Sequence, residues 1–199
     1  IKQFTCEEKL LLEKYYSISS VSKLTEVYKR AKYEDVKMIK KFKVLKNLKF
    51  IEFPKLGFIE LDKIVKKVKK LSGGILLIDY GFLKAQGNDT LQSLKSHKNN
   101  VYYNNIGKAD ITYLVNFQLL NRFLLNKKLF LNKIVSQSFF LKKLGIIERA
   151  EILSNKMSFK EKTDLYYRLE RLLSDKKMGK LFKVLFAASN KTKFNLGFK

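Results

Sequence analysis

The sequence has little of the chemistry that builds disulfide frameworks and metal centres. Among its 199 residues, Cys6 is the only cysteine and His97 the only histidine. A disulfide within the chain and a Cys/His zinc site are both excluded, and an intracellular protein is the expected class. No apolar run approaches the roughly 18 residues that a membrane-spanning helix needs. We therefore expect neither a metal site nor a membrane span.

Arginine is also scarce, although the net charge is +24. Lysine supplies almost all of this charge, and it cannot make the bidentate phosphate and base contacts that arginine makes. The excess therefore favours solvated lysine-rich faces over a specific nucleic-acid site. A basic, non-enzymatic nucleic-acid- or ribosome-associated module is the alternative function. The arginines are Arg30, Arg122, Arg149, Arg168 and Arg171.

One window departs from this charge pattern. Residues 72–121 contain four lysines, no arginine and three aspartates, which gives a local net charge of +1. The same window contains five of the nine glycines. Function often lies in loops carried by a rigid scaffold. A nucleic-acid binder should concentrate lysine around such a loop, so this neutral window argues against the alternative.

The most distinctive stretch of the window runs from Gly73 to Gly81. Five consecutive apolar residues, 74–78 after the first glycine, predict a strand over 74–80 buried on both faces, as in a parallel sheet. It ends in Asp79-Tyr80-Gly81. Because ligands of open α/β sheets bind at the carboxyl ends of the strands, these three residues are candidates for chemistry. The alternative is an ordinary turn, which Asp and Gly also favour.

Periodicity predicts most other elements as helices. Alternating residues predict a strand near 14–19 and another over 48–53, while 21–47 is mixed. We expect 81–109 to be a loop with a short strand at 101–103, and Asp110 or Thr112 to cap the helix that follows. The remaining expectations are helices over 58–71, 138–144, 146–153 and 158–172, and strands over 129–135 and 181–188.

Several short motifs follow one another in a distinctive order. They are Gly73-Gly74-(x4)-Asp79-Tyr80-Gly81, Asp89-Thr90-Leu91-Gln92, His97, Gly107-(x2)-Asp110-Ile111-Thr112-(x2)-Val115-(x)-Phe117, Phe139-Phe140-Leu141, Leu144-Gly145-Ile146-(x2)-Arg149-Ala150, Met178-Gly179-Lys180-Leu181-Phe182-Lys183-Val184 and Gly197-Phe198. Taken together, they resemble one family, the MidA-type S-adenosylmethionine-dependent methyltransferases. The resemblance runs from about residue 57 to the end. That family includes the mitochondrial arginine methyltransferase that assists respiratory complex I assembly.

The sequence departs from the family pattern in three ways. Ile106 stands where the family usually has proline, and Asn116 replaces an aspartate. The third departure is that no Gly-x-Gly-x-x-Gly loop is present to hold the cofactor. Because the chain begins at Ile1 rather than Met, we expect an earlier segment to carry that loop. The chain would then be inactive alone.

The resemblance implies an α/β fold class: the C-terminal half of a Rossmann-like class I methyltransferase fold with added C-terminal helices. The whole of 1–199 would be one incomplete domain. Residues 1–56 would hold later strands or an insertion, 57–117 a helix, a strand and the active-site loop, and 118–199 a helical part ending in a strand.

Three residues are candidates for catalysis: Asp79, Asp110 and His97. For a guanidinium substrate, a carboxylate supplies bidentate orientation and can accept a proton. A histidine can act as a general base near neutral pH. The structural alternatives are a strand-end turn for Asp79, a helix N-cap for Asp110 and a loop histidine bonded to nearby backbone for His97.

The candidates for substrate binding are Tyr80, Gly81, Thr112 and Gln137. Tyr80 and Gly81 would shape the crevice, since glycine permits close backbone approach. Gln137 could orient a substrate, with a surface amide as its alternative. The residues that bind the cofactor cannot be named from this sequence.

The function implied by the resemblance is methyl transfer from S-adenosylmethionine to a protein arginine. The expected partner is a protein substrate, with a respiratory complex I subunit as one candidate, and no specific nucleic acid is expected. The implied compartment is the bacterial cytoplasm or the mitochondrial matrix.

Overall fold

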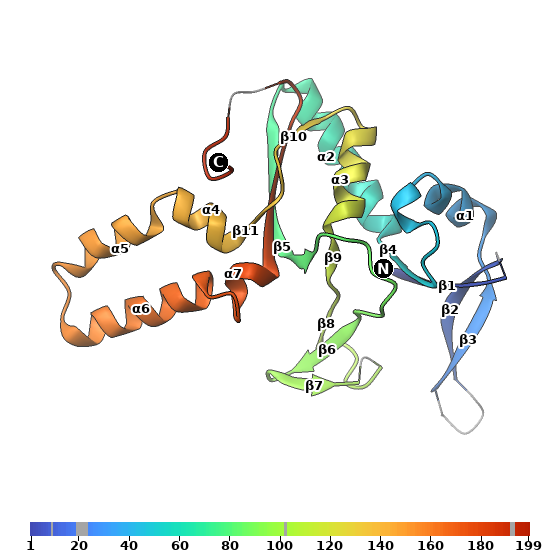
Figure 1. The fold of residues 1–199 in the computed structure, drawn as a ribbon. Coiled ribbons are helices and arrows are strands. Elements are labelled where there is room, and N and C mark those ends of the chain that lie inside the picture. The colour runs from blue at the N-terminus through green and yellow to red at the C-terminus, as the bar shows by residue number, and fades with distance from the viewer. Residues whose placement is uncertain (9, 19–23, 102, 192–193) are drawn as a thin grey trace. The chain divides into compact units, whose positions relative to one another are not determined.

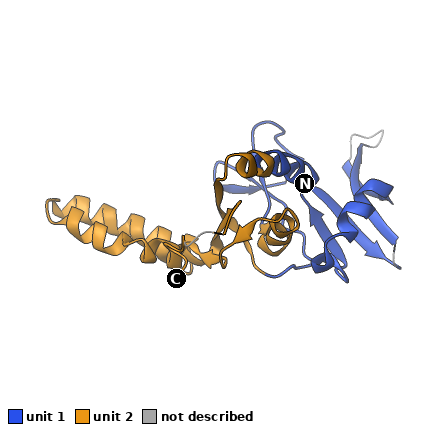
Figure 2. Cartoon of the chain, turned by 90° about the horizontal axis from the view of Figure 1, so that it is seen from above, with its two compact units in different colours: residues 1–64, 84–114 blue, residues 65–83, 115–199 orange. Residues whose placement is uncertain are grey.

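The computed structural model describes residues 1–8, 10–18, 24–101, 103–191 and 194–199 (Figure 1). They form two compact units, and each is described by itself (Figure 2). Unit 1 contains residues 1–64 and 84–114, and unit 2 contains 65–83 and 115–199. The chain passes from one unit to the other at three places, and the first, between residues 64 and 65, falls within helix α2, Lys55–Lys70.

Unit 1 is built on a four-stranded antiparallel sheet in the order β3-β2-β1-β4. Its central aromatic cluster joins three rings, Phe42, Phe53 and Phe58, whose centroids lie 5.6–6.0 Å apart. Phe53 and Phe58 are buried, and Pro54 between them ends the strand before α2 begins. The strands are β1 (Lys2–Glu7), β2 (Leu10–Ile18), β3 (Leu24–Arg30) and β4 (Phe50–Phe53), followed in chain order after β3 by α1 (Tyr33–Lys40) and the 3₁₀ turn η1 (Lys43–Leu45).

The segment expected to be a loop is instead a second, small antiparallel sheet of unit 1. Its order is β7-β6-β8, with β6 at Gln92–Lys95, β7 at Lys98–Asn100 and β8 at Asp110–Thr112. The expectation of a loop over 81–109 was therefore wrong, and the strand expected at 101–103 includes residue 102, which lies outside the described residues. Strands of three or four residues carry too little alternation to stand out in the sequence.

Unit 2 is organised around the antiparallel pair of β5 (Gly74–Phe82) and β12 (Phe182–Ala188), which are in register from Gly74 opposite Ala188 to Tyr80 opposite Phe182. The short strands β10 (Phe130–Leu131) and β11 (Val135–Ser136) pair with β12. On the other edge of β5, the two-residue strand β9 (Val115–Asn116) pairs parallel with Gly81 and Phe82.

The prediction that β5 is buried on both faces was wrong. Leu76 and Ile78 are each 47% exposed, and β5 is antiparallel to its long partner. Only its last two residues have a parallel neighbour. Among the described residues, the edge of β5 from Gly74 to Tyr80 that faces away from β12 has no strand partner.

Helices form the rest of unit 2, largely where the periodicity predicted them. They are α3 (Phe117–Asn126), α4 (Gln137–Lys143), α5 (Ile146–Ser154), α6 (Phe159–Leu173) and α7 (Met178–Leu181). Ser158 and Glu161 form the expected capping box at the start of α6. Helix α3 starts later than expected, because Asn116 is its N-cap and accepts from the Leu119 N–H. The predicted capping role of Asp110 or Thr112 was therefore wrong, since both lie in β8.

The core of unit 2 lies along β12 and the helices beside it. Val184, Leu185 and Ala187 of β12 are fully buried. Phe140 of α4 and Phe198 near the C-terminus stack 5.2 Å apart and pack with Val184. This packing makes β12 the rigid element against which β5 is held.

Candidate active site

Asp79, Tyr80 and Gly81 lie at the carboxyl end of β5, as the sequence predicted. The Asp79 carboxylate is exposed, and its Oδ1 accepts a 2.8 Å hydrogen bond from the Tyr80 N–H. The Tyr80 ring meets the Phe182 ring edge-on at 5.5 Å. The strand end therefore presents an ionisable group to solvent while its neighbour is packed against β12.

Gly81 is required by packing inside unit 2. A Cβ added there would lie 2.1 Å from the Val115 carbonyl oxygen, well inside any allowed contact. The backbone that approaches Gly81 closely is that of β9, and the role of Gly81 in shaping a substrate crevice stays a prediction. The parallel pairing of β5 and β9 thus depends on a residue without a side chain.

Lys183 of β12 contacts the end of β5, and this contact was not predicted from the sequence. It lies directly opposite Asp79 in the ladder. Its Nζ donates to the carbonyl oxygens of Gly81 at 3.0 Å, Leu181 at 3.0 Å and Lys180 at 2.5 Å. Burial, and then the neighbouring charge of Lys180, lower the pKa of Lys183. The sequence alone could not indicate the hydrogen bond between Lys183 and Gly81, because these residues are 102 positions apart.

Gln137 does not lie on the surface of unit 2. It is 7% exposed at the start of α4, and its Nε2 donates to the Leu172 carbonyl oxygen at 3.0 Å. The alternative of a surface amide is wrong. The side-chain amide instead connects α4 with the C-terminal end of α6.

The remaining candidates, His97, Asp110 and Thr112, lie in the small sheet of unit 1. His97 is exposed in the two-residue turn between β6 and β7, where Ser96 and His97 both have positive φ (49° and 62°). This backbone matches the turn that two-residue hairpins require. Asp110 is exposed opposite Leu94, and Thr112 lies opposite Gln92. Within unit 1, β8 thus carries both polar candidates on one short strand.

A polar network in unit 1 was also missed, although its Asp89-Thr90 motif contributes to the family resemblance. The Glu52 carboxylate accepts from the Gln3 Nε2 at 3.0 Å, the Thr90 N–H at 3.1 Å and the Thr90 hydroxyl at 2.5 Å. The Thr90 hydroxyl in turn accepts from the Leu114 N–H at 3.0 Å, and Asp89 accepts from Gln3 at 2.7 Å. The network fixes the segment before β6 to strands β1 and β4.

A second charged cluster of unit 1 is centred on Asp35, which is fully buried. Its carboxylate contacts Lys2 Nζ at 2.7 Å and Lys55 Nζ at 2.5 Å. Burial alone would raise the pKa of Asp35, but hydrogen bonds from the two lysines hold it below its ordinary value. This cluster links α1, β1 and the start of α2.

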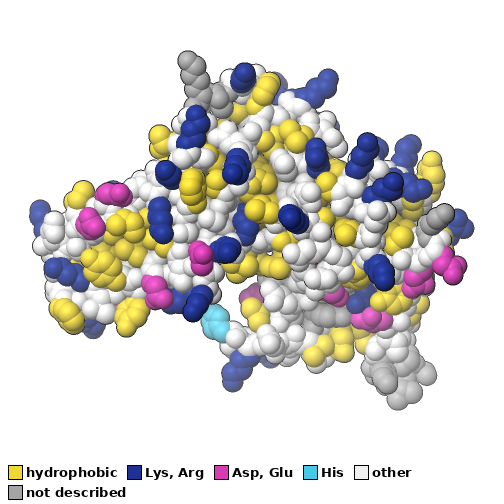
Figure 3. All heavy atoms as spheres, viewed as in Figure 1, with side chains coloured by type: hydrophobic (Ala, Val, Ile, Leu, Met, Phe, Trp, Pro, Cys, Tyr) yellow, Lys and Arg dark blue, Asp and Glu magenta, His cyan; other side chains and the backbone are white. Residues whose placement is uncertain are grey.

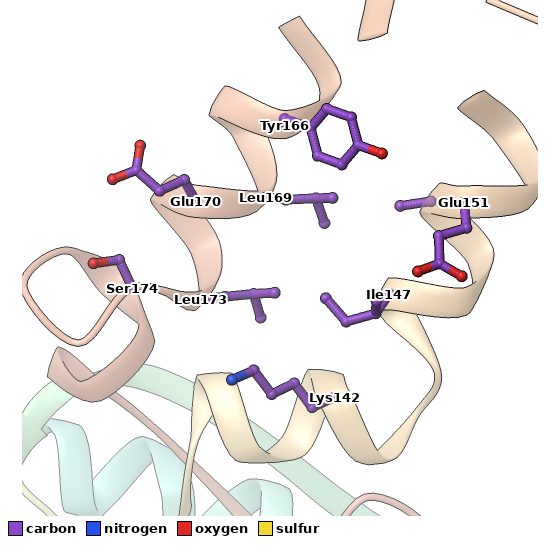
Figure 4. Close-up of a pocket in the computed structure, with 9 residues that line it drawn as sticks. Lys142, Ile147, Glu151, Tyr166, Leu169, Glu170, Leu173 and Ser174 are labelled. Carbon is purple, nitrogen blue, oxygen red and sulfur yellow. The ribbon is translucent and has the colours of Figure 1, made fainter. Parts of the chain in front are cut away.

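Each unit also contains a hollow. The hollow of unit 1, about 710 Å³, is lined mainly by apolar residues of β2, α1 and η1 and by four cationic side chains: Arg30, Lys40, Lys43 and Lys46. The hollow of unit 2 is about 440 Å³. Leu169 and Leu173 of α6 point there toward Ile147 of α5, with Lys142 at one end (Figure 4). Neither hollow is lined by Asp79, Tyr80 or Gly81.

The described part of the chain contains neither a cluster of metal-binding side chains nor a membrane-spanning helix. No group of three or more His, Cys, Asp or Glu side chains is placed to hold a metal ion. None of the helices described has the length and apolar content needed to cross a membrane.

Comparison with known proteins identifies the family. The model of the S-adenosyl-L-methionine-dependent methyltransferase family Methyltransf_28 matches residues 1–134. The chain belongs to this family. The resemblance to MidA-type methyltransferases is thereby confirmed, and S-adenosylmethionine is the cofactor of the family.

Relatives of this methyltransferase family member are known by sequence and by structure. The protein arginine methyltransferase NDUFAF7, mitochondrial, of Danio rerio is 27% identical over 122 residues, and that of Xenopus tropicalis is 29% identical over 124. Those matches cover 61% and 62% of this chain but only 28% of each relative. Two crystal structures of COG1565 superfamily proteins from Burkholderia thailandensis match with TM-scores of 0.74 and 0.70, at 18% and 19% identity.

The structural match covers essentially the whole chain, 99% and 100%, but only 52% and 50% of the two crystal structures. This methyltransferase family member therefore spans about half the length of the solved proteins it resembles. One of the two was crystallised with S-adenosyl-homocysteine.

The sequence has no Gly-x-Gly-x-x-Gly turn, and the end of β5 lines neither of the two hollows described above. What the arrangement does provide is an exposed carboxylate, Asp79, on a rigid strand end beside an aromatic ring.

Proposed function

We propose that the whole protein transfers a methyl group from S-adenosylmethionine to a guanidinium nitrogen of a protein arginine. The observation that carries the methyl-transfer part is the family match over residues 1–134. Arginine as the acceptor is supported by the printed names of the Danio rerio and Xenopus tropicalis relatives, which are 27% and 29% identical.

In this proposal the chain supplies the acceptor side of the reaction, and the cofactor supplies the methyl group. Methylation replaces one N–H hydrogen of the guanidinium by a methyl, so one proton must leave the nitrogen. The Asp79 carboxylate can orient the cationic guanidinium and accept that proton, because it is exposed and fixed on β5. Asp110, His97 and Thr112 of unit 1 and Gln137 of unit 2 stay predictions from the sequence and are given no part in this step.

We also propose that residues 1–199 are the second half of a Rossmann-like domain. Two observations support this: the chain covers about half of the matching crystal structures, and one backbone edge of β5 is unpaired from Gly74 to Tyr80 among the described residues. Such an edge can accept a further strand. In this proposal the residues that hold the cofactor lie in the other half.

The proposed partner is a protein presenting an exposed arginine, with a respiratory complex I subunit as the candidate given by the family resemblance. The proposed compartment is the mitochondrial matrix or a bacterial cytoplasm. The relatives' printed names place those relatives in mitochondria.

The test is a methyl-transfer assay with the full-length protein, labelled S-adenosylmethionine and arginine-containing peptides. Matched peptides with lysine in place of arginine are the control. Methylarginine in the digested product is the expected result. Label on lysine peptides alone, or no label with a folded and cofactor-bound protein, would overturn the choice of acceptor.

A further inference from the structure

The Lys183 ammonium group is held entirely by backbone oxygens. A lysine ammonium has three N–H donors, and here they meet the carbonyl oxygens of Gly81, Lys180 and Leu181 at 3.0, 2.5 and 3.0 Å. Lys183 lies opposite Asp79 in the ladder, yet the Asp79 Oδ1 accepts from the Tyr80 N–H instead. The amine therefore acts on the strand backbone and not on the carboxylate.

Two of these three acceptors belong to the end of α7, and the third belongs to the strand end of the proposed site. A lysine that only capped α7 would need the carbonyls of Lys180 and Leu181, since cations stabilise helix C-termini. The bond to Gly81 has a different consequence. It joins α7 and β12 to the peptide that follows Asp79-Tyr80.

The Gly81 peptide is held from two directions. On one edge it pairs with Val115 of β9, so closely that no side chain fits at position 81. The Lys183 ammonium binds its carbonyl oxygen. The preceding residue, Tyr80, is packed against Phe182, the neighbour of Lys183. The backbone on the C-terminal side of Asp79 thus has its direction set by Lys183, Phe182 and β9 together.

We propose that Lys183 is a positioning residue for methyl transfer: its ammonium fixes the Gly81 carbonyl and thereby the direction in which the Asp79 carboxylate leaves the end of β5. The proposal rests on the function proposed above for Asp79. Lys183 touches no substrate in this proposal, because its three donors are occupied by protein oxygens. Small displacements of a positioned group are costly, since about 1 Å of misplacement can lower the rate by about 10²-fold.

The experiment uses the full-length enzyme and compares Asp79→Asn, Lys183→Met, the double variant and Lys176→Met. Lys176 is an exposed lysine of unit 2 and is the matched control. We measure kcat and KM for an arginine peptide, cofactor affinity by calorimetry, and Tm. Lys183→Met is expected to lower kcat by roughly 10- to 10²-fold, with cofactor affinity and the Lys176→Met variant near wild type.

The double variant separates positioning from general loss of structure. If Lys183 acts through Asp79, the double variant loses little more activity than Asp79→Asn alone, because residues acting as a unit are not additive. The proposal would be overturned if Lys183→Met lowered kcat by the same factor in the wild-type enzyme and in the Asp79→Asn variant. A Lys183→Met enzyme with wild-type kcat would also overturn it.

Failure of the proposed function gives a different pattern from failure of this inference. Full activity in Asp79→Asn removes the role of Asp79, and with it the basis for positioning. A large loss in Asp79→Asn with full activity in Lys183→Met removes the positioning role alone. Should Lys183→Met fail to fold, Lys183→Arg keeps the charge but cannot direct a planar guanidinium at three convergent carbonyls. In that case the losses of kcat in Lys183→Arg, Asp79→Asn and their double variant are compared in the same way, and additive losses would overturn the positioning role.

Discussion

Asp79 combines three properties that few carboxylates of the chain share. It lies where the apolar run of β5 stops, three residues before the strand ends at Phe82, its side chain is exposed, and the residues beside it are held by ring packing and by the Lys183 ammonium. The expected alternative, a strand-end turn, was wrong for Asp79, because it lies inside β5 opposite Lys183. Asn offers the same side-chain acceptor for the Tyr80 N–H without the charge, so Asp79→Asn separates this structural contact from a chemical role.

In the full-length enzyme, Asp79→Asn is expected to lower methyl transfer by roughly 10²–10⁴, the range for a positioned acid–base group. Folding and cofactor affinity should persist because the carboxylate is exposed. The control is Asp164→Asn, an exposed aspartate of α6. Turnover at the wild-type rate in Asp79→Asn would leave the residue with a structural role only.

Asp35 illustrates the opposite case, a carboxylate that stabilises the fold. Replacing it with Asn removes the buried carboxylate that Lys55 and Lys2 share, although Lys2 keeps its ion pair with Glu13 at 2.7 Å. The expected loss in free energy of unfolding is about 3 kcal/mol at neutral pH, the low end for breaking a buried pair, since both lysines stay partly exposed. Urea unfolding measures it, with Asp164→Asn expected within about 0.5 kcal/mol of wild type.

The same pair has a defined pH dependence. Because the pKa of Asp35 is lowered from its ordinary value of 3.8, the stabilisation is complete above that value and is lost as the pH falls through the lowered pKa. The difference between wild type and Asp35→Asn should therefore be constant from about pH 5 to 7 and shrink in stronger acid. If the difference in free energy of unfolding between wild type and Asp35→Asn grew as the pH fell, the assignment of the stabilising charge to Asp35 would be contradicted.

Sequence reasoning located residues better than it located their contacts. Asp79 was placed at the end of a strand because an apolar run stops there, which is a local signal. The contacts of Gln137 and Lys183 were missed because their backbone partners are 35 and 102 positions away. For His97, the sequence left two roles open, a catalytic base and a loop residue. The structure places His97 in a tight turn, a position that many polar residues could occupy.

At the scale of elements, predictions succeeded where apolar periodicity was long. Helices α2 and α6 have 16 and 15 residues, and each was predicted to within a few residues. The sheet of β6, β7 and β8 was missed because its strands have three or four residues and its turn lacks an Asn-Gly signal. Strand β5 was predicted, but its burial was not, because five apolar residues indicate a strand without indicating what covers it.

The exposed edge of β5 leads to a prediction about residues 1–199 produced alone. An unpaired strand edge and exposed apolar side chains such as Leu76 and Ile78 promote association between copies, so the isolated chain should self-associate and should lack measurable S-adenosylmethionine affinity. Replacing Leu76 and Ile78 with Thr should reduce association in light scattering. Replacing the exposed Ile152 of α5 is the control.

Two results would contradict this account of β5. Tight cofactor binding by residues 1–199 in calorimetry would show that the second-half interpretation is wrong. Equal self-association of the Leu76/Ile78 and Ile152 variants would show that the strand edge has no special role.

At the scale of the whole molecule, the net charge of +24 is spread over both units. Lysine and arginine side chains are scattered across the face seen in Figure 3, with apolar and acidic side chains between them. This distribution agrees with the interpretation of solvated faces. In the sequence, residues 72–121 carry a net charge of only +1.

We therefore expect any affinity for nucleic acid to be electrostatic and independent of sequence. Binding to unrelated duplexes should weaken alike as salt rises, because each lysine–phosphate contact releases counterions. The matched test compares two triple lysine-to-glutamine variants: Lys67, Lys69 and Lys70 of α2, and Lys84, Lys98 and Lys108 of the window, all of which are exposed. With no dedicated site, both should reduce affinity and salt dependence by similar amounts, at most about one unit of slope per lysine. The contrary result would be a preference for one duplex that persists at moderate salt and is abolished by only one of the two triple variants. Such a result would favour a nucleic-acid-binding role for these surfaces over their assignment to a methyltransferase.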